Sequence, residues 1–324
     1  MLQPLWVVNT ARPAYGRAMS TRVAIARIQE YESTLLDRAT GLILDESSLA
    51  VLPGHRVLVK PNLVNGSNAR HCTSHPLVVK AACAWLLDQG AKVTVADSPA
   101  FGPASYVARA SGLAQAMADL GLKVTSLKRA TSWDLSDGGT IGLSQDALDA
   151  DVILNIPKLK VHCQMTMSGC IKNMFGCVVG FRKALAHNRL GHSHDVFRSM
   201  LMDVYEALPH THHLMDGIHP LHRDGPIKGD PFELGMLAAS SNGIALDTAA
   251  YALLGLTPQQ VPLWDEAFMR KLPGADPRDI IYPLEKPDQF DPTGFELSPE
   301  RELSFAPSRL IKGRMKSILK HFKK

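Results

Sequence analysis

The sequence predicts an α/β fold with a mostly parallel, doubly wound sheet, arranged as one domain or as two α/β lobes around a central cleft. Two observations lead to this prediction: short apolar runs end in polar or Gly/Pro residues, and helical patterns that stop at glycine alternate with these runs. Apolar residues at consecutive positions are typical of strands that are covered on both faces. Alternating strands and helices imply right-handed crossovers between parallel strands.

Five apolar runs are predicted to be buried parallel strands. In chain order they span residues 57–60, 92–96, 152–156, 214–215 and 236–239, and a strand-like run at 23–28 precedes them. Each of the five is followed within two residues by an Asn, Asp, Lys or Ser. In doubly wound sheets ligands bind beyond the carboxyl ends of the strands, so we expect the functional site among these polar residues.

Three helical patterns separate the strands. They cover residues 76–89, 104–120 and 244–254, and each is followed directly by a glycine, which is a common signal for the end of a helix. Ser241 or Asn242 is predicted to cap the last of them, with Asp247 one turn further as a candidate functional carboxylate.

The chain is expected to have three parts. The α/β domain spans residues 22–307, with any boundary between two lobes near residue 150. Within it, residues 258–307 are rich in proline and charge, and we predict an irregular wrap over the core there. An N-terminal extension (1–21) and a basic amphipathic tail (308–324) flank this domain.

The composition is that of an ordinary soluble globular protein, because 45% of the 324 residues are hydrophobic and 20% are charged. No run of about 18 uncharged apolar residues occurs, so no membrane-spanning helix is expected. The net charge of +4 comes from the tail, whose seventeen residues carry seven Lys or Arg and no acid. Because the rest of the chain is mildly acidic, nucleic acid is not an expected partner.

The tail and the cysteines bear on location. The tail reads SRLIKGRMKSILKHFKK, and a helix there would place apolar residues on one stripe with cations around it. Such a helix suits an anionic membrane surface or a partner's groove, and docking on its own domain is the alternative. Five cysteines are sparse and odd in number, and no signal peptide is recognisable. We therefore expect a cytoplasmic protein, with membrane association through the tail as an option.

The densest group of functional side chains lies between residues 155 and 194. It contains Lys158, Lys160, His162, Lys172, Asn173 and His187. Lysines neutralise an anionic ligand and glycines let the backbone approach it, so the segment predicts a phosphate or carboxylate site. Ligation of a metal ion by imidazole is a further option, and a basic surface loop without a ligand is the alternative. Fingerprints of dinucleotide-binding folds, P-loop NTPases and zinc proteases are absent.

Several blocks, taken in order, point to one family. They are VKPNLVNGSN (59–68), DVILNIPKLKVH (151–162), IKNMFGCVVG (171–180), MDGIHPLHRDGPIKG (215–229) and NGIALDTAAYALLG (242–255). Together they resemble the "domain of unknown function 362" family over roughly residues 23–255, which implies an α/β fold. Many members of that family carry an iron–sulfur ferredoxin module with closely spaced C-x-x-C-x-x-C runs. This chain has no such run, so that module is not expected here.

A second similarity concerns the order and spacing of His162, Lys172 and His187, which look like the metal-and-cofactor segment of nickel-pincer lactate racemases. The resemblance implies that Lys172 holds a nucleotide-derived cofactor. It also implies that His162 and His187 ligate a metal ion or transfer a proton, with His75 as another imidazole at the site. Neutral imidazole is a good ligand for nickel or iron, and a histidine pair can move protons near neutral pH.

The cysteines offer a different site. Cys163, Cys170 and Cys177 lie seven residues apart, and a continuous helix would place them on one face. With Cys72 they would supply four thiolates for an iron–sulfur cluster or a zinc ion. Glycines directly before two of them argue against a long helix, and buried apolar packing is the alternative.

A loop rich in Gly and Asp follows the predicted strand at 214–215. Asp216 begins it, and Gly225 and Gly229 lie further along. Such a loop offers backbone N–H groups to an anion or a carboxylate to a metal ion, whereas ordinary turn chemistry is the alternative. The rim of the same site is predicted to include Asn62 and, as weaker candidates, His219 and His222.

Together these features predict an enzyme that acts on a small anionic substrate. It would use a metal ion, nickel or iron, or a nucleotide-like cofactor, with acid/base chemistry by His162 and His187. An isomerase or racemase-like reaction and an oxidoreductase are both compatible with this set. An iron–sulfur redox protein that uses the cysteines and a peripheral membrane or partner-binding protein that uses the tail are the alternatives.

Overall fold

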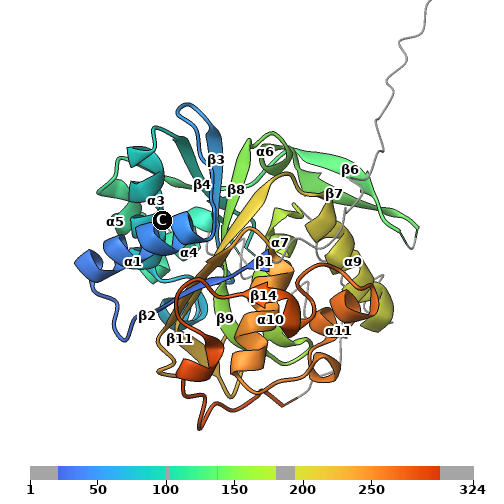
Figure 1. Ribbon diagram of the computed structural model, residues 1–324. Helices are drawn as coiled ribbons and strands as arrows, with labels where there is room; N and C mark the ends of the chain where they lie inside the picture. The colour runs from blue at the N-terminus through green and yellow to red at the C-terminus, as the bar shows by residue number, and fades with distance from the viewer. Residues whose placement is uncertain (1–20, 100–101, 137, 180–193, 300–324) are drawn as a thin grey trace, which may run out of the picture.

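The computed structural model describes residues 21–99, 102–136, 138–179 and 194–299. Their centre is a ten-stranded sheet with helices on both faces (Figure 1). The predicted fold class, an α/β protein with a mostly parallel, doubly wound sheet, is confirmed. His187, nearly all of the N-terminal extension and the whole tail lie outside the described residues.

The main path through the sheet follows the order β10-β9-β11-β8-β3-β4-β5. Its strands are β3 (Arg56–Pro61), β4 (Lys92–Asp97), β5 (Val124–Ser126), β8 (Val152–Ile156), β9 (Lys158–His162), β10 (Thr166–Ser168) and β11 (Thr211–His222). Three further strands extend it through β11: β12 (Asp230–Pro231), β13 (Met236–Ser240) and β2 (Ala24–Arg27). Two small ribbons pair β1 (Thr21–Arg22) with β14 (Ile280–Ile281) and β6 (Ala130–Asp134) with β7 (Thr140–Ser144).

All five predicted strands are present, but one runs in the other direction. The strands β5, β4, β3, β8 and β11 pair in parallel, whereas β13 is antiparallel to both β11 and β2. The parallel assignment of residues 236–239 was therefore wrong. A parallel return needs a crossover, usually a helix. Here the chain turns back at once, because β12 and β13 pair in succession with β11.

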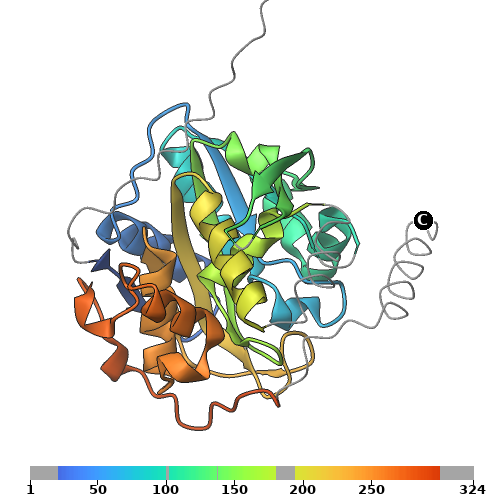
Figure 2. The same ribbon diagram turned by 90° about the vertical axis from the view of Figure 1, so that its right-hand side faces the viewer.

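Two layers of helices cover the sheet. One face carries α1 (Ser33–Glu46), α3 (Pro76–Asp88), α4 (Ala104–Ser111) and α5 (Leu113–Ala118), and these helices share one apolar core with the strands. The other face carries α7 (Cys170–Met174), α9 (His194–Ala207), α10 (Gly243–Leu253) and α11 (Pro262–Met269). Figure 2 shows α9, in yellow, in front of the sheet. Short turns of helix are α2 (Ala69–Cys72), α6 (Gln145–Leu148), η1 (Phe175–Cys177), η2 (Pro258–Gln260), η3 (Pro277–Asp279) and η4 (Pro287–Gln289).

Local signals explain several helix boundaries. Gly112 adopts φ +87° and divides the predicted helix at 104–120 into α4 and α5, a backbone conformation that glycine tolerates. Asn242 caps α10 as predicted, because its side chain accepts hydrogen bonds from the N–H groups of Ile244 and Ala245.

The predicted wrap at 258–307 is more regular than expected over its described part. It contains α11 and three 3₁₀ turns, and each of these four begins with a proline. Proline suits the first helical position, because its missing N–H would be unpaired there anyway. The prolines that suggested irregular structure therefore start helices.

The strand order reverses between β3 and β8. From β3 the chain proceeds to β4 and β5 on one side, and then β8 returns to the other side of β3. At Pro157 the chain bends from β8 into β9, which continues alongside β11. The sheet is continuous across residue 150, and a lobe boundary there stays a prediction. Such a reversal point is where open α/β sheets bind ligands.

Candidate functional site

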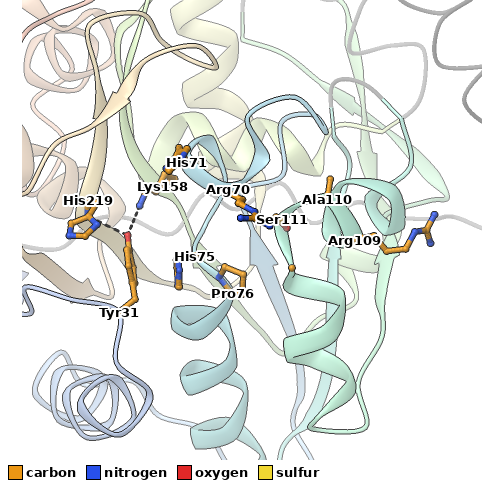
Figure 3. Close-up of a pocket in the computed structure, with 11 residues that line it drawn as sticks. Tyr31, Arg70, His71, His75, Pro76, Arg109, Ala110, Ser111, Lys158 and His219 are labelled. Carbon is orange, nitrogen blue, oxygen red and sulfur yellow. Dashed lines mark hydrogen bonds between the residues drawn. The ribbon is translucent and has the colours of Figure 1, made fainter.

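A cavity of about 470 Å³ lies near the reversal point, and we call it the Lys158 pocket (Figure 3). The residues that matter for its chemistry are Tyr31, Arg70, His75, Arg109, Lys158 and His219. They come from distant parts of the chain: the turn before α1, the helices α2 and α4, the N-cap of α3, the first residue of β9 and the middle of β11. Among the residues that the structure describes, no Asp or Glu lines this cavity.

The floor of the pocket is a buried hydrogen-bonded triad of Lys158, Tyr31 and Asp216. The Lys158 ammonium donates to the Tyr31 hydroxyl at 2.7 Å and to Asp216 Oδ1 at 3.0 Å. The Tyr31 hydroxyl donates to the same oxygen of Asp216 at 2.9 Å. Asp216 Oδ2 accepts the backbone N–H of His75 at 2.8 Å. The carboxylate thus holds both Lys158 and the start of α3 in place.

The charges in this triad follow from its burial, since the side chains of Lys158 and Asp216 are 3% and 0% exposed. Burial alone would raise the pKa of Asp216, but Lys158 and the His75 N–H outweigh it and hold this pKa below its usual value. Burial, together with Asp216, raises the pKa of Tyr31 far above its usual value. Burial lowers the pKa of Lys158, and Asp216 acts in the opposite direction. Because the amine and the carboxylate lie 3.0 Å apart and favour each other's charged form, we describe the floor as a carboxylate, an ammonium and a protonated hydroxyl.

Two imidazoles flank Tyr31. The ring of His75 stacks on it at 3.6 Å between centroids, and His219 meets it edge-on at 5.1 Å. Burial lowers the pKa of His75 to about 4, so this imidazole is neutral at pH 7. Its Nδ1 accepts the N–H of Leu77 at 3.3 Å, which leaves the proton on Nε2. The pocket therefore contains a neutral imidazole with an N–H.

A second polar cluster lies behind the pocket and contains Lys160 and three asparagines. Lys160 donates to Asn62 Oδ1 and to the carbonyl of Cys72. Asn62 then donates to Asn173 at 2.7 Å, and Asn173 donates to Asn155 at 2.7 Å. These bonds form an amide chain from β3 through α7 to β8, which ties the carboxyl ends of both central strands to α7.

Three lysines share this region. Burial lowers the pKa of Lys160 to about 7, and repulsion by Lys172 and Lys158 acts in the same direction. Burial also lowers the pKa of Lys172 to about 8. The lysines predicted to bind a ligand therefore interact with one another, and burial weakens the positive charge of Lys160 and Lys172 near neutral pH.

Asp247 fixes the start of α7, the helix that carries Lys172. It is 2% exposed and accepts the backbone N–H groups of Cys170 at 2.6 Å and Ile171 at 3.1 Å. Burial raises its pKa to about 7. This position indicates that Asp247 orients α7.

The structure places the predicted site residues in several different surroundings. Lys158, Asp216 and His75 lie in the pocket or its floor. The second cluster contains Lys160, Lys172, Asn62 and Asn173. Gly225 and Gly229 serve close packing, because a Cβ at either would overlap a backbone carbonyl of β9 or β11. His162 ends β9, where its Nδ1 accepts the Gln164 N–H at 3.1 Å, and it does not line the pocket. His187 lies outside the described residues.

The predicted metal ligands do not form a metal-binding group. Among the residues that the structure describes, no three or more His, Cys, Asp or Glu side chains are placed to hold a metal ion. This covers His75, His162 and Asp216, and also Cys72, Cys163, Cys170 and Cys177, none of which forms a disulfide within the described residues. The seven-residue spacing does not place the thiols on one helix, because α7 ends at Met174. The described residues therefore do not fit a nickel, iron or iron–sulfur centre.

Sequence reasoning missed Tyr31, Arg70 and Arg109. Tyr31 follows the strand-like run at 23–28, so the rule that polar residues after strands line the site would have found it. Arg70 lies shortly after β3 and could have been found in the same way. Arg109 lies in the last turn of α4, and the packing of α2 against α4 brings this turn to the cavity.

Comparisons with known proteins give one family and one full-length relative. The family model described as "Domain of unknown function (DUF362)" matches residues 57–252. A thylakoid-associated protein of Synechocystis sp. is 34% identical over 313 residues, which cover 94% of this chain and 95% of the relative.

Two solved structures are more distantly similar. The lactate racemase apoprotein of Thermoanaerobacterium thermosaccharolyticum matches with a TM-score of 0.44 and 13% identity, over 70% of this chain and 55% of the racemase. A protein of Thermotoga maritima matches with a TM-score of 0.42 and 10% identity, over 67% of this chain and 57% of that protein. The chain thus spans little more than half of either protein, and neither similarity bears on activity.

Proposed function

The chain belongs to the family described as domain of unknown function 362, and because this description assigns no activity, we propose one from the geometry of the Lys158 pocket. The protein is an enzyme that binds a small carboxylate or phosphate compound in this pocket and carries out an acid/base step on it. One observation supports this most: a cavity of about 470 Å³ is lined by lysine, arginine and histidine, and no Asp or Glu of the described ranges lines it.

The roles of the floor residues follow from a count of their hydrogen bonds. The Tyr31 hydroxyl donates to Asp216 and accepts from Lys158 and from the backbone N–H of His219, which uses its one proton and both lone pairs. Tyr31 is thus a positioning residue. An ammonium has three protons, and the bonds to Tyr31 and Asp216 take two of those on Lys158. Its third proton is available to an anionic substrate.

His75 is the group best suited to move a proton in this pocket. It is neutral at pH 7, its Nε2 carries the proton, and it lies beside the Lys158 ammonium that would bind the substrate. With Nδ1 held by the Leu77 N–H and a pKa of about 4, His75 acts from its Nε2–H as the proton donor of this step and not as its base. The acid/base roles of His162 and His187 stay predictions. The proposed step involves no metal ion, because the described residues do not supply a group of ligands for one.

Two variants test binding and chemistry separately. Thermal shift with acetate, lactate, glycolate and inorganic phosphate should show stabilisation of the wild type that Lys158→Met abolishes. Lys123→Met, an exposed lysine before β5, is the matched control and should behave as the wild type. Deuterium incorporation from D₂O into bound hydroxy acids, followed by NMR, should be lost in His75→Gln while binding persists. Equal anion binding by wild type and Lys158→Met would refute the proposal.

We also propose a second function, association with a membrane surface through the tail at 308–324. The support is the relative of 34% identity that is named as thylakoid-associated, together with the basic amphipathic pattern of the tail. Among the described residues no helix has the length and apolarity that a bilayer crossing requires. The full chain should float with anionic vesicles at low salt, and a variant with the tail lysines replaced by glutamine should not. Equal flotation of both proteins would contradict the proposal.

A further inference from the structure

The two imidazoles that flank Tyr31 differ in the ring nitrogen that stays available. His219 lines the Lys158 pocket on the other side of Tyr31 from His75, as Figure 3 shows. Its Nε2 lies 2.9 Å from the carbonyl oxygen of Gln29. A carbonyl oxygen only accepts hydrogen bonds, so in the neutral ring Nε2 carries the proton and Nδ1 has a lone pair. No side chain or backbone group of the described ranges hydrogen-bonds this Nδ1. His219 therefore offers a proton acceptor, whereas His75 offers an N–H.

Both imidazoles lie next to the point where the Lys158 ammonium is fixed. The Tyr31 hydroxyl accepts from Lys158 Nζ at 2.7 Å and from the backbone N–H of His219 at 3.3 Å. The same tyrosine ring stacks on His75. A small compound that binds to Lys158 is thus bordered by a proton acceptor and by an N–H donor. His219 is also only partly buried, so a proton that it takes up can exchange with solvent.

This set of groups selects a particular kind of substrate. An imidazole removes a proton from carbon only where the developing negative charge is delocalised, and a neighbouring carbonyl group does this by forming an enolate. An N–H donor at the carbonyl oxygen stabilises the charge that develops there. An ammonium in the same pocket is complementary to a carboxylate. A 2-oxo acid combines these features, because its carbonyl group lies between a carboxylate and a carbon that bears protons.

We propose that His219 is the base of the acid/base step and that the substrate is a small 2-oxo acid. The carboxylate binds to Lys158, and His219 Nδ1 takes a proton from the carbon next to the carbonyl group. The electron pair of this C–H bond forms the C=C bond of an enolate, and the C=O π pair moves to the oxygen, to which His75 Nε2–H donates. Return of the proton from His219 to the carbon restores the carbonyl group. This inference rests on the proposed function and narrows its substrate class.

Hydrogen exchange into pyruvate tests this on the full chain, because the methyl protons of pyruvate lie next to its carbonyl group. In D₂O the wild type should exchange these protons at least about tenfold faster than buffer alone, as followed by NMR. His219→Gln should return the rate to that of buffer. Thermal shift with pyruvate should show that this variant still folds and binds, because Lys158 is retained. His210→Gln, at an exposed position outside the pocket, is the matched control and should exchange as the wild type does.

A second measurement separates this route from catalysis by a lysine amine. An amine can promote the same exchange by forming an imine with the carbonyl group, and borohydride reduces that imine to a stable amine adduct. Lys158 is held as an ammonium by Asp216 and Tyr31, so no imine is expected. The intact mass of the protein should therefore stay unchanged after treatment with pyruvate and borohydride. An adduct on Lys158 would overturn the role of His219.

The failures of the two proposals can be told apart. If pyruvate stabilises the wild type but not Lys158→Met, and its protons exchange no faster than in buffer, the inference is refuted and the proposed pocket stands. The same holds if His219→Gln exchanges as fast as the wild type. If Lys158→Met leaves the stabilisation by pyruvate and the other anions unchanged, the proposed function itself fails.

Discussion

The strand β3 has an ion pair at each end, and the two pairs differ in burial. At its start Arg56 bonds Asp151 at 2.8 Å, with side chains 61% and 36% exposed. Near its end Lys60 pairs with Asp97 at 2.9 Å, with side chains 0% and 3% exposed. We predict that Lys60→Met strongly destabilises the protein and that Arg56→Gln has little effect, because solvent screens the exposed pair.

The magnitude follows from the charge that would be left behind. Removal of one partner from a buried ion pair typically costs about 3–5 kcal/mol, because the remaining charge stays buried without compensation. In Lys60→Met this charge is Asp97, whose Oδ2 also accepts the N–H of Leu63 at 2.9 Å. For a chain of this size the midpoint of thermal unfolding should fall by on the order of 6–10 °C. In the double variant Lys60→Met/Asp97→Asn the charge is removed, and an amide oxygen can still accept the Leu63 N–H.

Urea unfolding followed by far-UV circular dichroism measures these differences. The double variant should recover at least half of the stability lost in Lys60→Met, whereas Arg56→Gln should unfold near the wild-type midpoint. The reasoning would be refuted if Lys60→Met lost less than about 1 kcal/mol, the range typical of surface pairs. It would also be refuted if the double variant were as unstable as the single one.

Three other predictions use the same assay. Burial lowers the pKa of His213 to about 3, so below pH ~6.5 the unfolded chain binds a proton that the native chain does not. The free energy of unfolding should therefore fall as the pH falls from about 6.5 towards 3, by up to about 1.4 kcal/mol per pH unit. His213→Gln should make this slope shallower, whereas the control His210→Gln, at an exposed position, should not. Gly176→Ala should lower the free energy of unfolding by about 1–3 kcal/mol, because the new Cβ would overlap the buried Lys60–Asp97 pair. Gly41→Ala, whose Cβ would meet its nearest atom at 3.4 Å, should be neutral or stabilising. Similar losses of stability in both variants would contradict this. Tyr31→Phe keeps the ring but removes the hydroxyl between Lys158 and Asp216, so it should lower the free energy of unfolding by about 1–3 kcal/mol. It should also weaken anion binding in the thermal-shift assay, and an unchanged anion affinity would exclude the positioning role of Tyr31.

The fold was predictable where the chain obeys local rules. The strands β3 and β8 are largely buried runs because helices cover both faces of the sheet, and α3 and α10 each end two residues before a predicted glycine. The direction of β13 was not predictable in this way. An apolar run reads the same in either direction, and only its pairing with β11 and β2 decides between them.

The site was predictable only in part, for a related reason. Lys158 and Asp216 each follow a buried apolar run, so the rule for strand ends identifies them without knowledge of their contact. The partnership of Tyr31 with both depends on the pairing of β2 with β13 and of β13 with β11, which lies more than 180 residues along the chain from Tyr31. Arg109 is an exposed residue of a helix, and nothing in its neighbourhood in the sequence distinguishes it from other surface arginines.

The two sides of the Lys158 pocket are built from different kinds of structure, strands on one side and short helices on the other. Because Lys158 and Asp216 lie on hydrogen-bonded strands, the sheet itself holds the Lys158 end of the cavity in place. Arg70 and Arg109 sit on two short helices outside the sheet, where a changed side chain or an altered turn leaves the strands undisturbed. Sequence changes on α2 and α4 can therefore alter this side of the pocket without disturbing the strands that hold Lys158 and Asp216.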